Sequence, residues 1–294
     1  MTINNEFEIN GKTGLYALLG SPVSHSISPL MHNASFRALG LNDVYLCFDV
    51  SDTNLDETLA GLKNIGIKGF NCTYPDKNKM CILADELSPA AKMIGAVNTV
   101  LNDNGRLKGY NTDGTGYMMA VKDAGYDIIG KKMTLLGAGG AASAICVQAA
   151  IDGVSEIDVY SIKDQFWDRA VKLIDNINNN TNCKASLYEF NDDVSFRNSV
   201  STSTILTNAT SVGLAPNVDN CPVSDTSVFR EGLIVSDVIY NPKETKFLRL
   251  AKDAGCSTFN GMYMLLYQGA EAFNIWTGMN MPVEYIKKTF FAQN

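Results

Sequence analysis

A glycine-rich loop between an apolar run and an alanine-rich stretch constrains the fold of this chain more than any other feature. The run Lys-Met-Thr-Leu-Leu leads into Gly-Ala-Gly-Gly-Ala-Ala at residues 137–142, and an apolar segment of helical character follows. This is a G-x-G-x-x-A pattern between a strand and a helix, which is typical of dinucleotide-binding folds. Gly137 permits the tight turn, Gly139 lets the backbone approach a pyrophosphate, and the small Ala142 lets the helix pack closely on the strand. A glycine turn that serves packing alone is the alternative. The predicted phosphate-binding residues are Gly137, Ala138, Gly139, Gly140 and Ala141.

Apolar runs of strand length alternate with stretches of helical period on both sides of this loop. From Lys132 onward the alternation repeats several times, which favours a parallel doubly wound sheet. A length of 294 residues favours two domains. We therefore predict an α/β protein with two α/β domains around a cleft, the C-terminal one a Rossmann-type doubly wound parallel sheet. The predicted boundaries are 1–112, completed by C-terminal helices at 262–294, and 113–261.

Composition and charge exclude several classes of protein. The net charge is −7 and no cluster of Lys and Arg forms a basic stripe, so nucleic acid is not expected as a partner. No apolar run approaches the ~18–20 residues of a membrane span, and the polar first dozen residues lack a secretory signal, so we expect a cytoplasmic protein. Seven scattered cysteines without a C-x-x-C pair indicate reduced thiols, and the only histidines, His25 and His32, predict no metal site. The expected partner is a small molecule.

The adenosine end of the predicted nucleotide site is less well defined. The strand that follows the glycine helix ends near Ser161-Ile162-Lys163, which contains no arginine to pair with the 2′-phosphate of NADP. Asp164 is the nearest acidic residue that could accept from the 2′-hydroxyl of NAD. A helix-entry role for Asp164, favoured by the helix dipole, is the alternative. We predict NAD as the preferred cofactor, with NADP as the second.

The first half of the chain contains short loops rich in hydroxyl and amide side chains, each close to an apolar run. They span residues 24–29, 71–77, 95–99 and 109–113. Taken singly, each has an ordinary structural explanation, because a serine before Pro29 suits a helix N-cap and 111–113 suit a helix start.

In this order, followed by the glycine loop and a late apolar helix, these loops resemble the shikimate dehydrogenase family along nearly the whole chain. The resemblance is closest to the branch that accepts quinate as well as shikimate. The sequence around Tyr45 is one of the segments that resemble this branch. It implies that 1–112 form a catalytic, substrate-binding domain and that 113–261 bind NAD(P), with Gly261 among the cofactor-binding residues. It also implies that the substrate carboxylate and ring hydroxyls contact Ser26, Ser28, Tyr45, Thr73, Asn98, Thr112, Tyr240 and Gln268.

The same resemblance implies a catalytic pair, Lys77 and Asp113. Oxidation of a secondary alcohol needs a proton acceptor beside the hydroxyl while hydride leaves for nicotinamide, and the reverse reaction needs a proton donor. A lysine held by an aspartate suits both roles. A surface ion pair without a catalytic role is the alternative.

The activity implied is the reversible NAD(P)-dependent oxidation of the 3-hydroxyl of shikimate to 3-dehydroshikimate, and of quinate to 3-dehydroquinate. The sequence leaves open whether the enzyme serves aromatic amino acid biosynthesis through chorismate or the breakdown of quinate. It also leaves the oligomeric state open, and a homodimer is compatible with it. Two alternatives are a non-catalytic sensor of shikimate-type ligands and another two-domain dehydrogenase, such as a folate-linked one. The intact Lys77 and Asp113 argue against the first, and the serine loop argues against the second.

Overall fold

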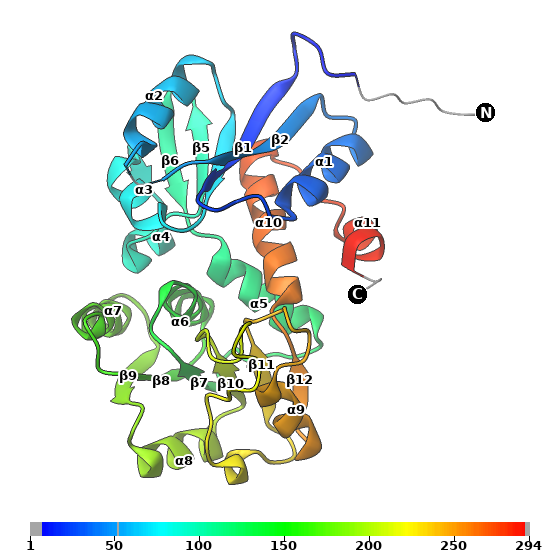
Figure 1. Cartoon of the computed structure of the whole chain (residues 1–294). Helices are drawn as coiled ribbons and strands as arrows, with labels where there is room; N and C mark the ends of the chain where they lie inside the picture. The colour runs from blue at the N-terminus through cyan, green and yellow to red at the C-terminus, as the bar shows by residue number, and fades with distance from the viewer. Residues whose placement is uncertain (1–7, 52, 292–294) are drawn as a thin grey trace. The chain divides into compact units, whose positions relative to one another are not determined.

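Two six-stranded sheets organise the chain, which the computed structural model describes over residues 8–51 and 53–291 (Figure 1). Each sheet lies in its own compact unit. Unit 1 contains the described residues up to Thr112 and those from Gly269 onward, and unit 2 contains Asp113–Gln268. The predicted class, an α/β protein with two α/β domains and a doubly wound parallel sheet in the C-terminal one, is confirmed.

Unit 1 is built on a mixed sheet with the strand order β2-β1-β3-β5-β6-β4. Parallel pairing joins β1 to β2 and β3, whereas β5 is antiparallel to both β3 and β6. The strands are β1 (Gly14–Gly20), β2 (Asp43–Asp49), β3 (Gly69–Cys72), β4 (Glu86–Leu87), β5 (Thr99–Asp103) and β6 (Arg106–Tyr110). The helices are α1 (Ser28–Ala38), α2 (Leu55–Asn64), α3 (Lys77–Leu83) and α4 (Pro89–Ile94).

The residues from 269 onward complete the core of unit 1. They comprise the second half of α10 (Met262–Thr277), α11 (Val283–Ile286) and a π-helical turn at Lys287–Phe291. The indole of Trp276 packs against the Tyr16 ring at a tilt and donates a 2.9 Å hydrogen bond to the carbonyl of Val100. Gly69 leaves the space that this indole fills, because a Cβ there would overlap the Trp276 ring.

Unit 2 is built on an all-parallel sheet with the strand order β12-β11-β10-β7-β8-β9. This is the strand order of a doubly wound dinucleotide-binding fold. Figure 1 shows α6 and α7 on one face of the sheet and α8 and α9 on the other. The strands are β7 (Lys132–Leu136), β8 (Glu156–Ser161), β9 (Lys184–Glu189), β10 (Ile205–Asn208), β11 (Ile234–Asp237) and β12 (Ser257–Phe259). The helices are α5 (Asp113–Asp123), α6 (Gly140–Asp152), α7 (Trp167–Asn180), α8 (Asp193–Thr202), the 3-10 helix η1 (Thr226–Val228) and α9 (Lys246–Asp253).

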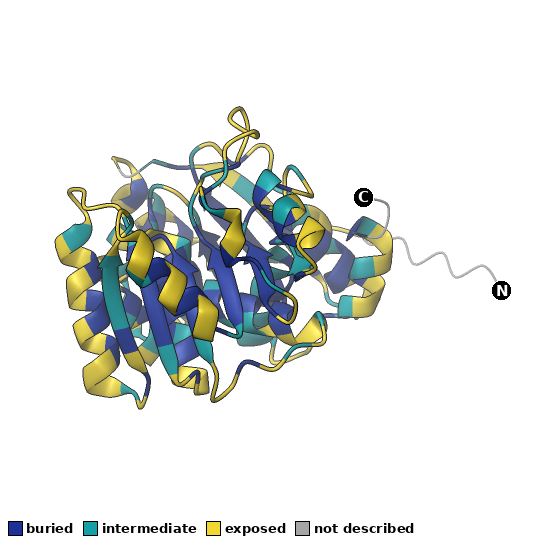
Figure 2. Ribbon diagram, turned by 90° about the horizontal axis from the view of Figure 1, so that it is seen from below, coloured by how far each residue is buried: buried dark blue, intermediate teal, exposed yellow. Residues whose placement is uncertain are grey.

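The four central strands of unit 2 are largely buried, as parallel strands covered on both faces must be; they are β8, β7, β10 and β11. In Figure 2 the strands are mostly dark blue, and the helices expose yellow outer faces. Leu136, Tyr160, Leu206 and Phe247 belong to one buried cluster of this sheet and its helices.

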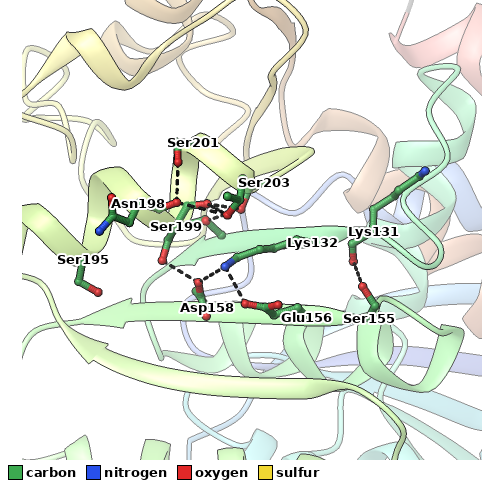
Figure 3. Close-up of polar contacts among 12 residues, drawn as sticks. Lys131, Lys132, Ser155, Glu156, Asp158, Ser195, Asn198, Ser199, Ser201 and Ser203 are labelled. Atoms are coloured by element: carbon green, nitrogen blue, oxygen red, sulfur yellow. Dashed lines mark hydrogen bonds and ion pairs between the residues drawn. The ribbon is translucent and has the colours of Figure 1, made fainter.

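One charged network lies within this apolar surrounding, at the amino-terminal half of β7 and β8 (Figure 3). The ammonium of Lys132 lies 2.6 Å from Glu156 Oε1 and 2.7 Å from Asp158 Oδ2. Ser199 donates a 2.6 Å hydrogen bond to the same oxygen of Asp158. Burial alone would lower the pKa of Lys132, but its two carboxylate partners raise it above the ordinary value. The network is therefore satisfied internally.

No helix in the described part of the chain is long and apolar enough to cross a bilayer. Within 8–51 and 53–291, no three His, Cys, Asp or Glu side chains gather as metal ligands would.

Candidate active site

The serine loop of unit 1 enters α1 without a side-chain cap. Ile27 is the N-cap residue, and Ser28 and Pro29 already belong to the helix. The explanation of Ser28 as an N-cap is therefore wrong. Ser26 Oγ instead accepts a 3.2 Å hydrogen bond from the backbone N–H of Ser28, whose side chain is buried.

Tyr45 connects this loop to the end of β3. Its phenol donates a 2.7 Å hydrogen bond to Asn71 Oδ1 and is fully buried on β2. Burial raises its pKa well above the usual 10, while a hydrogen bond with Ser28 acts in the opposite direction. Tyr45 is therefore a neutral hydroxyl between the predicted carboxylate site and Asn71.

Asn71, on β3, extends this hydrogen-bond network to the start of β5. Its Nδ2 donates to the carbonyl of Asn98 at 3.1 Å and to Thr99 Oγ1 at 3.0 Å. The sequence predicts no role for Asn71 or Thr99, although both lie in the predicted polar segments 71–77 and 95–99; in the structure they belong to β3 and β5. The signal for them is the pairing of β3 with β5, which places Asn71 opposite Thr99.

Asn98 and Thr112 lie together at the far end of this network. Asn98 Oδ1 accepts from the backbone N–H of Thr112 at 2.8 Å and from Thr99 Oγ1 at 2.9 Å, and Asn98 Nδ2 donates to Thr112 Oγ1 at 3.0 Å. All three residues are buried. Four predicted substrate residues, Ser28, Tyr45, Asn98 and Thr112, thus share one chain of neutral polar groups.

The lysine loop follows β3 directly. Thr73 is held by a 2.9 Å hydrogen bond from its N–H to the carbonyl of Leu19, and its side chain is half-buried. Lys77 is the first residue of α3, and its carbonyl accepts from the N–H of Val97 at 2.9 Å. Thr73 and Lys77 belong to unit 1, whereas Asp113 is the first residue of α5 in unit 2. Asp113 follows Thr112 in the chain, so the Asn98 contacts anchor the backbone that leads into it.

The glycine loop of unit 2 has the geometry of an anion site. Gly137 has a φ of +101°, and a Cβ there would lie 3.0 Å from the carbonyl of Ala209, so only glycine suits this turn. Gly139 is the N-cap of α6 and has no side-chain cap, and the Cβ positions of Gly139 and Gly140 face open space. The N–H groups of the first turn of α6 are thus available to a phosphate. Ala142, the third small residue of the pattern, is buried.

Beyond β8 the predicted adenosine contact has a local structural role. Asp164 Oδ1 accepts a 2.8 Å hydrogen bond from the N–H of Phe166 in the turn before α7. This is the helix-entry role, and contact with a ribose stays a prediction. Ile162 is 65% exposed at the same edge, and the ammonium of Lys163 lies 5.9 Å from the centre of the Trp167 ring.

The three remaining predicted residues lie after β11. Tyr240 is partly exposed in the loop that follows this strand. Gly261 is buried, and a side chain there would overlap the carbonyl of Val238, so packing alone requires glycine. Gln268 lies in α10, where its Nε2 donates to the carbonyl of Leu265 at 2.9 Å.

Comparison with known proteins identifies relatives over nearly the whole chain. The family model described as shikimate dehydrogenase substrate binding domain matches residues 18–100, and the model described as shikimate 5'-dehydrogenase C-terminal domain matches 261–289. A shikimate dehydrogenase (NADP(+)) of Listeria innocua is 50% identical over 283 residues, which cover 96% of this chain and 97% of the relative. A quinate/shikimate dehydrogenase of Escherichia coli is 42% identical over 281 residues, which cover 96% of this chain and 98% of the relative.

The solved structures agree with this similarity. Shikimate 5-dehydrogenase from Listeria monocytogenes, crystallised with shikimate and NAD, matches with a TM-score of 0.94 and 49% identity. The match covers 97% of this chain and 98% of that chain.

Proposed function

Because this chain belongs to the shikimate dehydrogenase family, we propose that it is an NAD(P)-dependent oxidoreductase that reversibly oxidises the 3-hydroxyl of shikimate to 3-dehydroshikimate. The observation that carries this proposal is the neutral polar network of unit 1, which joins Ser28, Tyr45, Asn98 and Thr112 through Asn71 and Thr99. We propose unit 1 as the substrate-binding domain and unit 2 as the NAD(P)-binding domain of a cytoplasmic enzyme.

The side chains near the serine loop suit a carboxylate that is bound without a buried counter-charge. Ser26, Ser28 and Tyr45 are neutral hydroxyls, and hydrogen bonds to a charged acceptor contribute about 1.5–3 kcal/mol each. Asn98 and Thr112 suit ring hydroxyls, because amides and hydroxyls both donate and accept. A polyol that lacks one hydroxyl would leave such a group unpaired, which is how a site of this kind selects its substrate.

In the proposed mechanism Lys77 holds or takes a proton at its Nζ beside the reacting hydroxyl. Asp113 orients the ammonium and completes the acid–base pair. Gln268 and Thr73 contact the substrate ring. When bound at the α6 N-terminus, the nicotinamide cofactor supplies the hydride acceptor and donor. The residues of this chain bind and orient both molecules and move the proton.

The segment after β8 and the names of the relatives bear on the cofactor and on a second substrate. Ile162 and the absence of arginine in 161–163 favour NAD over NADP. The Listeria innocua relative has NADP(+) in its name, and the Listeria monocytogenes structure contains NAD. We propose quinate as a second substrate because the Escherichia coli relative has both acids in its name.

The deciding experiment measures initial rates with shikimate and with quinate, each with NAD and with NADP, by the absorbance of the reduced nicotinamide. We expect turnover of shikimate with both cofactors and faster turnover with NAD. Folded protein without turnover in any of the four combinations would refute the proposed activity.

A further inference from the structure

Asp237 is a fully buried carboxylate at the carboxyl end of β11, and the proposed chemistry does not use it. Three segments of unit 2 donate hydrogen bonds to it. Asn208 Nδ2, at the end of β10, lies 3.1 Å from Oδ1, and the N–H of Ile239 lies 3.0 Å from the same oxygen. Thr245 Oγ1, at the N-cap of α9, donates to Oδ2 at 2.7 Å.

Through Asn208 the carboxylate reaches the loop that abuts the glycine turn. Asn208 Oδ1 accepts from the N–H and the hydroxyl of Thr210 at 3.1 and 2.7 Å, and its Nδ2 also donates to the carbonyl of Val212 at 3.2 Å. The methyl of Thr210 lies 3.0 Å from the position that a Cβ of Gly137 would take. Two hydrogen-bonded steps therefore connect Asp237 with Thr210, whose methyl group lies beside the predicted phosphate loop.

On the other side Asp237 fixes both ends of the Tyr240 loop. Its contact with the N–H of Ile239 holds the residue before Tyr240, and its contact with Thr245 holds the end of the loop. The carbonyl of Ile239 also accepts from the N–H of Gly261 at 3.2 Å, next to the start of α10. The partly exposed phenol of Tyr240 thus projects from a backbone that is pinned on either side.

A comparison with Asp158, in the same sheet, shows what is unusual about Asp237. Asp158 is equally buried but pairs with Lys132, so its charge is compensated within the fold. The hydrogen-bond donors of Asp237 are all neutral, and burial raises its pKa while these three hydrogen bonds lower it. A buried carboxylate is costly compared with an apolar residue. Only an acceptor with two oxygens, however, satisfies donors from three separate segments.

We propose that Asp237 is a positioning residue for the nicotinamide half of the cofactor site, acting through the 208–212 loop and the Tyr240 loop. The inference rests on the proposed assignment of unit 2 to NAD(P). In a doubly wound sheet the dinucleotide lies outside the carboxyl ends of the strands, near the change of strand order. β10 and β11 are the strands that follow β7 on that side of the sheet, so the loops held by Asp237 border the ligand.

The test compares Asp237→Asn with Asp158→Asn, a matched loss of one buried charge in the same sheet. Binding of NADH and NADPH is measured by nucleotide fluorescence, together with KM for cofactor, KM for shikimate, kcat and Tm. Asp237→Asn should raise the Kd and KM for cofactor roughly tenfold, the loss expected for one hydrogen bond to a charged group, with the shikimate KM nearly unchanged. Asp158→Asn should lower Tm and leave the cofactor Kd unchanged.

A second pair keeps the test decisive if Asp237→Asn does not fold. Thr245→Val removes the hydroxyl that bonds to Asp237 and should weaken cofactor binding, whereas Thr245→Ser retains the hydroxyl and should bind as the wild type does. The positioning role would be overturned if Asp237→Asn bound the cofactor as tightly as the wild type does. If Asp237→Asn does not fold, wild-type binding by Thr245→Val would overturn it. Equal weakening in Asp158→Asn would overturn it too.

The fluorescence measurement also separates this inference from the proposed function. A wild-type protein that binds reduced cofactor but turns over neither shikimate nor quinate would refute the activity and leave the Asp237 comparison intact. A wild-type protein that binds neither NADH nor NADPH would overturn the role of Asp237.

Discussion

Each unit has a polar network on neighbouring buried strands, and the network at the end of β3 in unit 1 differs in charge from the one at the start of β7 and β8 in unit 2. In unit 1 the groups are neutral, and they run from Tyr45 through Asn71 to Asn98 and Thr112. In unit 2 the corresponding feature is the ion pair of Lys132 with Asp158, which Figure 3 shows with its serine partners.

The position of each network along the strands explains the difference. The Lys132 network lies at the amino-terminal half of β7 and β8, away from the glycine loop that follows β7. Its charges satisfy one another, so it serves the fold. The unit 1 network lies at the end of β3, beside loops whose hydroxyls are half-exposed, and neutral donors and acceptors there can still turn toward a ligand. The charged network therefore stabilises the sheet of unit 2, whereas we propose that the neutral network of unit 1 serves the ligand.

The largest expected effect is on catalysis in unit 1. Lys77→Ala should lower kcat by roughly 10²–10⁴-fold without changing Tm, because general acid–base help has that magnitude. Lys79→Ala, on the same helix and paired with Asp56, is the control and should keep wild-type kcat. Steady-state rates with shikimate decide the matter, and a Lys77→Ala enzyme as fast as wild type would remove the proposed acid–base pair.

The next effect is on stability in unit 2. Lys132→Met should lower the free energy of unfolding by about 3 kcal/mol, because it leaves the Asp158 carboxylate buried without its cation. The KM for cofactor should not change, since the network is remote from the glycine loop. Urea unfolding measures the first quantity, and the exposed Lys131→Met is the control. A variant with the same free energy of unfolding as wild type would show that the ion pair of Lys132 does not stabilise unit 2.

Acid should act on unit 1 through His32. This ring is fully buried against Tyr45, and neither ring nitrogen has a hydrogen-bond partner among the described residues. Burial lowers its pKa from 6.5 to about 3, so the folded state holds the neutral form. The unfolded chain takes up a proton below pH 6.5 and the folded one does not, so stability falls as the pH drops from 6.5 toward 3.

Between pH 7 and pH 5 this amounts to about 2 kcal/mol of unfolding free energy. His32→Phe keeps the ring stacking and removes the titration, so its unfolding free energy should vary less over the same range. Parallel urea titrations at the two pH values give the comparison. Identical pH slopes for variant and wild type would rule out His32 as the acid-sensitive group.

The smallest expected effect is on cofactor choice in unit 2. Ile162→Arg places a guanidinium at the exposed end of β8 and should raise the NADP-to-NAD ratio of kcat/KM roughly fivefold, the effect of about 1 kcal/mol at an exposed site. Ile151→Arg adds the same charge in the last turn of α6, at the end of the helix opposite to the glycine loop, and should leave the ratio unchanged. An unaltered ratio in Ile162→Arg would place the adenosine 2′ position away from this residue.

The doubly wound unit was the more predictable of the two. Its short apolar runs alternate with long stretches of helical period, and Gly137 marks the turn between the first strand and its helix. This pattern predicts a parallel sheet, because the strands of such a sheet are short, mostly apolar runs. The sequence also predicts unit 1 as α/β, but it predicts a loop at residues 109 and 110. They belong to β6, because the turn at Asn104 and Gly105 folds β6 back on β5 and pairs Tyr110 with Thr99.

In the candidate site, too, local segments could be predicted from the sequence, whereas contacts between distant segments could not. Single loops such as 71–77 are recognisable in a sequence because hydroxyl and amide residues cluster there. The partners that join the loops are not, since Asn71 meets Tyr45 only after β1 has brought β2 and β3 to its two sides. Asp237 was overlooked for the same reason: its donors are Asn208, Ile239 and Thr245, and the spacing along the chain does not reveal the contact with Asn208.

Unit 1 is assembled from both ends of the chain, whereas unit 2 is continuous, and this has a consequence for synthesis on the ribosome. Domains fold as units as they emerge. The first 112 residues emerge early, but the space beside Gly69 stays unfilled until Trp276 has been translated. Unit 2 is complete by Gln268 and can fold before that point. The face of unit 1 that Trp276 covers therefore stays uncovered until the whole of the second unit has been translated.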